Sequence, residues 1–198
     1  MVDAGPEIEA HHHGHTGHRW LDVLLGVSAM VISVASLFLA IHHGHTMEKM
    51  VEASTWPYVE ISFSNATVDG RPVAKLDVIN SGVGPARIET TEMFFQGKAM
   101  ASRHALVKAM ARSDQMKVLS STVSDRVLRA GDTIPALQTD PGMAASPAYF
   151  QHFQENLSQV TSRICYCSVL EQCWLRDSRQ PKPEKVKACP KPAVPYES

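Results

Sequence analysis

Apolar residues fill one continuous stretch near the N-terminus of this 198-residue chain, from Trp20 to Ile41. The stretch contains no Lys, Arg or Glu, and its one charged residue, Asp22, lies near its start. Twenty-two residues in a helix extend for roughly 33 Å, which is enough to cross the hydrocarbon core of a bilayer. The pattern therefore predicts a transmembrane helix over residues 20–41, with the lipid bilayer as its partner.

A cleavable signal peptide is the alternative interpretation of this stretch. The apolar run exceeds the usual length of a signal peptide, the segment before it is acidic and His-rich, and Ala40-Ile41-His42 is not a small-residue cleavage site. These features favour an anchor that remains in the protein. Arg19 lies beside its N-terminal end and the next basic residue beyond its other end is Lys49, so the charge bias favours the N-terminus inside.

The segments on either side of the apolar stretch have different compositions. Residues 1–19 are rich in Gly, His and acidic residues, so we expect a disordered tail that cannot bury enough apolar surface to fold. Residues 42–56 keep helical spacing and predict a helical neck. The neck is expected to end at Trp56, because a residue that precedes a proline favours extended geometry.

From Tyr58 onwards the pattern changes to the alternation of a half-buried strand. Further strands are expected over residues 73–79, 87–95, 163–170 and 173–175, and turns at Asp69-Gly70 and Gln96-Gly97-Lys98. Residues 102–116 have helical spacing, and Ser146-Pro147 is a typical start for a helix running to about residue 160.

Short strands separated by Gly/Pro turns predict an all-β domain over residues 57–179, an immunoglobulin-like β-sandwich decorated with two helices. An α+β domain is the alternative. Residues 180–198 form a Pro-rich tail. The fold class is therefore membrane-anchored all-β or α+β, with one N-terminal transmembrane helix.

The loop from Asn80 to Ala86, NSGVGPA, has the glycine content of a phosphate-binding loop. Such a loop opens a helix and carries a Lys after its last Gly. Here Pro85 follows, and the next segment has strand character. We therefore interpret the segment as a tight turn between two strands.

All four cysteines lie in the last 34 residues, which fits a disulfide in an oxidising compartment. Buried free thiols in a cytosolic domain are the alternative. Cys165 and Cys167 share one face of a strand, about 6.6 Å apart, which disfavours a bond between them. The spacing is CxC and not the CxxC that a redox or metal role favours. We predict a structural disulfide between Cys173 and Cys189, which would close a loop of about 15 residues.

Histidines occur in two matching segments, and the pentapeptide that starts at His12 recurs at His42. Imidazole is a common ligand for Zn²⁺, Cu²⁺ and Ni²⁺. The candidate metal ligands are His12, His13, His15, His42, His43 and His45. A polar flank at each end of the membrane helix is the simpler interpretation.

Small residues recur along the apolar helix at steps of three and four, which is a heptad pattern. Close packing between membrane helices favours small side chains at the contact. The pattern predicts a homodimer through Gly26, Ala29, Ser33, Ser36 and Ala40.

Three segments carry a resemblance to known proteins: MEKMVEASTWPY at residues 47–58, NSGVGPA at 80–86, and CYCSVLEQCW at 165–174. Over residues 20–190 the chain resembles an uncharacterised group of proteobacterial single-pass membrane proteins. The resemblance implies an N-terminal anchor, a neck ending in W-P-Y and an extracytoplasmic β-domain. It implies a bacterial inner-membrane location with the C-terminal domain in the periplasm, and it implies no particular activity.

The net charge is −1, and the sequence shows no stripe of basic residues, so nucleic-acid binding is not expected. No Ser/His/Asp arrangement can be recovered from the sequence, and no cofactor motif is present. We therefore expect a membrane-anchored extracytoplasmic interaction or scaffold protein without catalytic activity. Metal binding or sensing by the two His segments is the alternative, and a thiol enzyme is a third interpretation.

Overall fold

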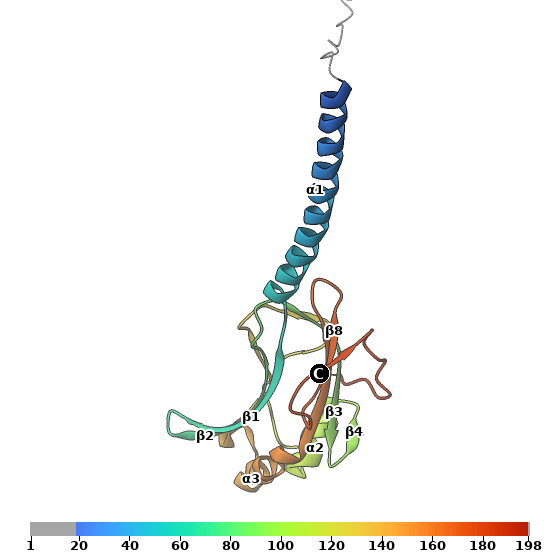
Figure 1. The fold of residues 1–198 in the computed structure, drawn as a ribbon. Helices are drawn as coiled ribbons and strands as arrows, with labels where there is room; N and C mark the ends of the chain where they lie inside the picture. Colours follow the sequence, from blue (N-terminus) through green and yellow to red (C-terminus); the bar gives the residue numbers. More distant parts are fainter. Residues whose placement is uncertain (1–18, 198) are drawn as a thin grey trace, which may run out of the picture. The chain divides into compact units, whose positions relative to one another are not determined.

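The computed structural model describes residues 19–197, in which the chain separates into two compact units. The first unit ends at Lys49 and the second begins at Met50. One helix, α1 (Arg19–Ser54), makes up the described part of the first unit and the start of the second (Figure 1). The expected membrane helix and neck are thus one continuous helix. The expected tail lies outside the described residues, apart from Arg19, which begins α1.

Helix α1 is long and apolar enough to cross a membrane by its length and composition. Two serine hydroxyl groups of its apolar part bond to the helix itself: Ser28 Oγ donates to the Leu25 carbonyl at 2.9 Å, and Ser33 Oγ donates to the Ala29 carbonyl at 2.8 Å. A bilayer interior offers no water, so a polar group there must find its partner within the protein. These bonds make the apolar part of α1 compatible with a lipid environment.

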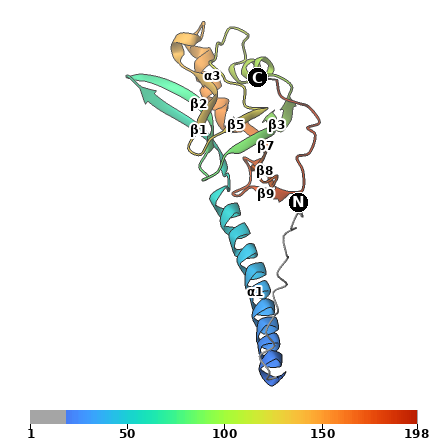
Figure 2. The same ribbon diagram turned by 90° about the horizontal axis from the view of Figure 1, so that it is seen from above.

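The second unit is mostly β and contains, in the described residues, two antiparallel sheets (Figure 2). The smaller sheet has the order β1-β2-β6. The larger sheet has the order β4-β3-β7-β8-β9, and β5 also pairs with β3. The strands are β1 (Val59–Val68), β2 (Arg71–Asn80), β3 (Ala86–Phe95), β4 (Lys98–Met100), β5 (Arg126–Leu128), β6 (Thr133–Thr139), β7 (Val160–Cys167), β8 (Cys173–Asp177) and β9 (Glu184–Val186).

Two-residue turns set the register of the first two hairpins. Asp69 and Gly70 connect β1 to β2, and both have positive φ angles, of 50° and 76°. Gln96 and Gly97 connect β3 to β4 with φ angles of 51° and 79°. Positive φ at both positions matches the twist of the flanking strands, and Gly adopts it without steric cost. Both turns expected from the sequence are confirmed.

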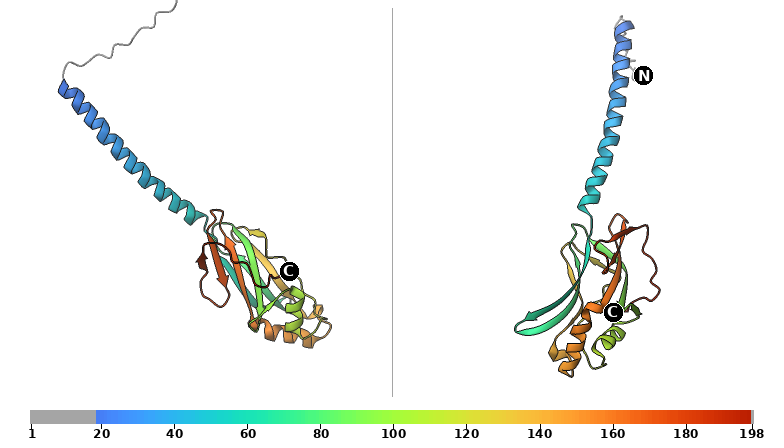
Figure 3. Two further views of the ribbon diagram at one scale, coloured as in Figure 1. Left: turned by 90° about the vertical axis from the view of Figure 1, so that its right-hand side faces the viewer. Right: turned by 60° about the horizontal axis from the view of Figure 1, so that its bottom comes forward.

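One apolar core receives side chains from both sheets, which face each other in Figure 3. Leu76 and Val78 come from the smaller sheet, and Ile88, Ile164 and Tyr166 come from the larger one. The alternation of buried and less buried residues along β2 follows the period of two that a strand requires. Both sheets therefore contribute to one core, and β2 has the alternation that its sequence predicts.

Two α-helices and two 3₁₀ turns complete the second unit: α2 (Arg103–Ala111), α3 (Pro147–Asn156), η1 (Pro141–Met143) and η2 (Leu157–Gln159). Ser102 caps α2 by accepting the Ala105 N–H at 3.2 Å. Asn156 Nδ2 donates to the Met110 carbonyl at 3.0 Å, which ties α3 to α2. The expected helices are present but shorter. Helix α2 ends where Arg112 adopts a φ angle of 55°, and η2 and then β7 follow α3 after Asn156.

Candidate functional site

Both disulfides lie on the outer face of the larger sheet. Along β7, Ile164 and Tyr166 belong to the core, so Cys165 and Cys167 point the opposite way. Cys167 is the register partner of Cys173 on β8, with Cα atoms 4.0 Å apart, and the two are bonded. Cys165 is bonded to Cys189, with Cα atoms 5.6 Å apart.

The expected Cys173–Cys189 disulfide is wrong. The strands expected over residues 163–170 and 173–175 leave a two-residue turn between them, which places no cysteine opposite Cys173. The structure begins the turn at Ser168, whose hydroxyl accepts the N–H groups of Leu170 and Gln172 at 3.2 and 3.4 Å. This earlier turn sets Cys167 directly across from Cys173 and leaves Cys189 for Cys165.

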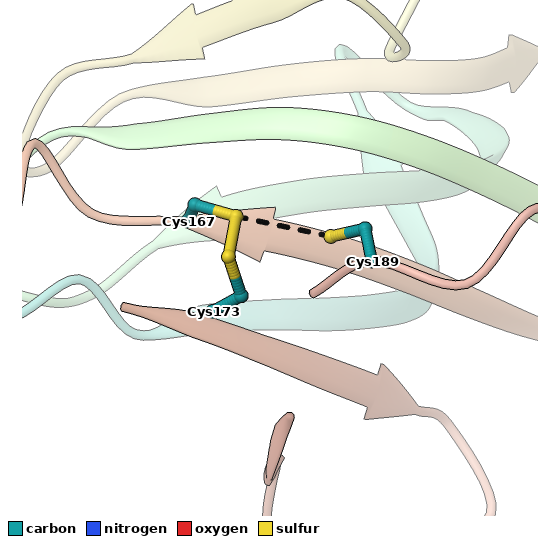
Figure 4. Close-up of side chains that lie close together, drawn as sticks. All are labelled: Cys167, Cys173 and Cys189. Carbon is teal, nitrogen blue, oxygen red and sulfur yellow. Dashed lines mark hydrogen bonds between the residues drawn. A yellow bond between two sulfur atoms is a disulfide. The ribbon is translucent and has the colours of Figure 1, made fainter. Parts of the chain in front are cut away.

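The two disulfides are adjacent. Cys167 Sγ lies 3.8 Å from Cys189 Sγ. A dashed line joins these two sulfurs in Figure 4. The sulfurs of Cys167, Cys173 and Cys189 all lie within 4.8 Å of one another. Cys165, Cys167 and Cys173 are buried, whereas Cys189 is partly exposed. The cluster therefore has one accessible sulfur and three protected ones.

We expect the two disulfides to stabilise the domain unequally. The chain-entropy model assigns about 3.5 kcal/mol to a bond that closes a loop of 24 residues and about 2 kcal/mol to one that closes six. The double variant C165S/C189S should therefore lose more unfolding free energy than C167S/C173S. Denaturant titration of both variants measures this difference, and equal losses would show that loop closure does not determine it.

An ion-pair ladder crosses the same outer face. Arg163 on β7 lies between Glu92 on β3, at 3.5 Å, and Asp177 on β8, at 3.6 Å. Arg179 Nη2 donates to Asp177 Oδ2 at 2.6 Å. This hydrogen bond lowers the pKa of Asp177 against the opposing effect of burial. The ladder pairs the carboxylates of this face with arginine side chains, so it acts as a structural feature of the sheet.

Asn80 is fully buried and joins three segments of the domain. Its Nδ2 donates to the carbonyls of Gly84, Leu128 and Arg129 at 2.8, 3.1 and 3.2 Å. Its Oδ1 accepts the N–H groups of Tyr58 and Gly82 at 3.2 and 3.1 Å. We call residues 55–58 and 80–84 with these contacts the junction clasp.

The glycines of the junction clasp allow two backbones to touch. Val83 N and Gly84 N donate to the Trp56 carbonyl at 3.0 and 3.2 Å. A Cβ added at Gly82 would lie 2.6 Å from Trp56 O, and one added at Gly84 would lie 2.6 Å from Thr55 Cα. The loop 80–86 is thus a tight inter-strand turn, as expected, and the N–H groups of Ser81, Val83 and Gly84 bind backbone carbonyls of the same domain.

The smaller sheet has one covered edge and one uncovered edge. Residues 117–121 cover β6, with Leu119 N donating to the Gln138 carbonyl and Ser121 N to the Pro135 carbonyl, at 2.8 and 3.0 Å. Strand β1 is the opposite edge. Within residues 19–197 it pairs only with β2, and it is exposed from Asn65 to Val68. Among the described residues, no further backbone hydrogen bond beyond the β1–β2 ladder is found for residues 61–68.

The register shows which backbone groups of β1 point outward. Asn80 N and O bond to Asp132 O and Gly131 N, on the side away from β1. Its partner Val59 therefore directs its own backbone groups away from β2, and every second residue after it does the same. The outward groups of the exposed half are those of Asn65 and Thr67.

Ser113, His104 and Asp114 line one cavity of about 340 Å³ beside α2. His104 Nε2 lies 3.4 Å from Asp114 Oδ1, and both side chains are exposed. Ser113 Oγ accepts the Gln115 N–H at 3.1 Å instead of bonding to His104. The arrangement lacks the link between nucleophile and base that a Ser-His-Asp triad needs.

The predicted histidine ligands stay a prediction. His12, His13 and His15 lie outside the described residues. His42, His43 and His45 are exposed on α1, and His45 Nδ1 approaches Glu48 Oε2 at 3.8 Å. In residues 19–197 the one group of three or more closely spaced metal-ligand side chains is the cysteine cluster, whose sulfurs are used in disulfides.

The predicted dimer seam also stays a prediction. Its five small residues are exposed on α1, and the Ser33 hydroxyl donates to the Ala29 carbonyl within the same helix.

A search for related proteins by family model, among characterised proteins and among solved structures finds no match to the chain.

Proposed function

We propose that this chain is a single-pass membrane protein that presents an interaction or scaffold domain outside the cytoplasm and has no catalytic activity. In this proposal α1 spans a bacterial inner membrane, and residues 57–179 form an immunoglobulin-like β-sandwich in the periplasm. Two disulfides support an oxidising compartment, where such bonds form and persist. The apolar helix supports the anchor.

The observation that carries an interaction function is the uncovered edge of β1. Proteins usually protect a sheet edge by keeping it short, adding Lys or Pro, or covering it with a loop. The larger sheet ends in three-residue strands, and β6 is covered, but β1 has ten residues whose one charge is Glu60. Such an edge can accept an extended segment of another protein as an added strand. We therefore assign the partner segment to β1, next to Asn65 and Thr67.

A proline at position 65 tests this assignment. Asn65 N–H points away from β2, so Asn65→Pro removes no hydrogen bond of the domain but removes a donor from the edge. Asn65→Ala keeps the donor and serves as the matched control. We expect the proline variant to reduce partner binding at least about tenfold, while both variants keep thermal midpoints within a few degrees.

The measurement is quantitative mass spectrometry of proteins that co-purify with full-length protein from native membranes. A genuine edge partner is depleted with Asn65→Pro and retained with Asn65→Ala. Identical protein sets for the two variants would exclude the β1 edge as the binding surface. A C-terminal alkaline phosphatase fusion tests the orientation separately: the proposal requires an active enzyme, and an inactive but stably produced fusion would overturn it.

A further inference from the structure

The two disulfides of the cysteine cluster are not independent of each other, because Cys167 Sγ and Cys189 Sγ lie 3.8 Å apart. We propose that the cluster is a thiol–disulfide exchange site in which Cys189 changes its disulfide partner from Cys165 to Cys167. The co-reactant is a dithiol, either a small molecule or a pair of cysteines in another protein. This site is separate from the β1 edge and does not depend on the proposed function.

The segment that carries Cys189 supports such a movement. Residues 187–195, which we call the strap, connect β9 to the buried side chain of Tyr196. Within the described chain, the strap makes no backbone hydrogen bond outside the regular strands. Three of its residues are prolines, which have no N–H to donate. The strap is thus fixed at one end by β9 and at the other by Tyr196, and between its ends by the Cys165–Cys189 disulfide.

The distances favour Cys167 as the second partner of Cys189. Cys165 and Cys167 lie two residues apart on the same face of β7, so both sulfurs are on the side that the strap covers. Cys189 Sγ is already 3.8 Å from Cys167 Sγ. A disulfide bond is about 2.05 Å long, so a shift of roughly 2 Å would bring these two sulfurs to bonding distance.

The first step is reduction of the accessible disulfide. A thiolate of the dithiol attacks Cys189 Sγ, the Cys165–Cys189 bond breaks, and Cys165 leaves as a thiolate that takes up a proton. The second thiol of the reductant then attacks the mixed disulfide, which releases Cys189 as a thiolate and oxidises the dithiol to its disulfide. Attack at Cys189 is favoured because the other three cysteines of the cluster are buried.

The second step is the exchange itself. The Cys189 thiolate attacks Cys167 Sγ, so the Cys167–Cys189 bond forms and the Cys167–Cys173 bond breaks. The electron pair leaves on Cys173, which takes up a proton. The product has one disulfide and free thiols at Cys165 and Cys173. In this way a dithiol in solution opens a buried bond that it cannot reach directly.

The variant Cys165→Ser tests the exchange without any reductant, since it leaves Cys189 as the free thiol. The full-length protein in detergent is unfolded in acidic denaturant with excess alkylating agent, so that buried thiols are also labelled. It is then digested without reduction and mapped by mass spectrometry. We expect a Cys167–Cys189 link with alkylated Cys173, alongside the original pair. Cys189→Ser is the control: its free thiol, Cys165, should be the sole site of alkylation.

Wild-type protein treated with one equivalent of dithiothreitol and quenched with alkylating agent gives an independent result that does not require a variant to fold. The exchange predicts molecules with a Cys167–Cys189 link and alkylation at both Cys165 and Cys173. If partial reduction labels Cys165 and Cys189 alone, and Cys165→Ser shows an unchanged Cys167–Cys173 bond, the proposal is wrong.

Discussion

The variant Gly84→Ala is expected to lose about 3 kcal/mol or more of unfolding free energy, at the upper end of what one added methyl group costs in a packed site. The added Cβ would overlap the backbone carbonyl of Thr55, and it would lie 2.6 Å from Thr55 Cα. Backbone atoms cannot rotate away as a side chain can. Relief would require breaking the bonds from Val83 and Gly84 to the Trp56 carbonyl.

Val83→Ala is the matched control, because Val83 lies between the two clasp glycines and its side chain is 64% exposed. We expect its unfolding free energy to stay within about 0.5 kcal/mol of wild type. Denaturant titration followed by tryptophan fluorescence measures both variants. If Gly84→Ala and Val83→Ala are equally stable, the loop does not pack against residues 55–58 as described.

The second large effect is expected at Asn80. Replacement by alanine leaves three carbonyl groups and two N–H groups without the partner that the side chain provides. Each buried polar group left unsatisfied costs about 1–3 kcal/mol, although water entering the space would satisfy some of them. We expect a net loss of about 3–5 kcal/mol and faster amide hydrogen exchange at Tyr58 and Gly82.

Asn65→Ala is the control for this prediction, because it makes the same substitution at an exposed strand position. It should change the unfolding free energy by less than about 0.5 kcal/mol. A loss below about 1 kcal/mol for Asn80→Ala would mean that Asn80 does not hold the clasp together.

Local patterns predicted the parts of the fold that local physics determines. The long apolar stretch indicated α1, the alternation in residues 73–79 indicated β2, and Asp69-Gly70 indicated the first hairpin turn. Each of these depends on neighbours within a few residues, where periodicity and the φ preference of glycine act directly.

The disulfide pairing was not predictable in the same way, because it depends on register. Moving the β7–β8 turn by a few residues changes which cysteine faces which. The residue that could have indicated the earlier turn is Ser168, because a serine hydroxyl can accept the N–H groups of the residues that follow it. The pairing of Cys165 with Cys189 also needs the path of the strap, which no local pattern specifies.

The junction clasp was missed for a related reason. The W-P-Y segment and the NSGVGPA loop were each recognised as motifs, but their contact joins residues more than 20 positions apart. Asn80 looked like an ordinary turn residue in the sequence, and its burial follows from three segments that meet only in the folded domain. The exposed edge of β1 likewise depends on the strand order.

We propose that α1 anchors a domain that folds in an oxidising compartment around two adjacent disulfides. The most direct measurement is a peptide map of protein whose free thiols are blocked in intact cells before lysis, digested without reduction. We expect Cys165–Cys189 and Cys167–Cys173 as the main linked pairs, with little alkylation at any cysteine. Alkylation of all four cysteines would contradict it, because the domain would then lie in a reducing compartment.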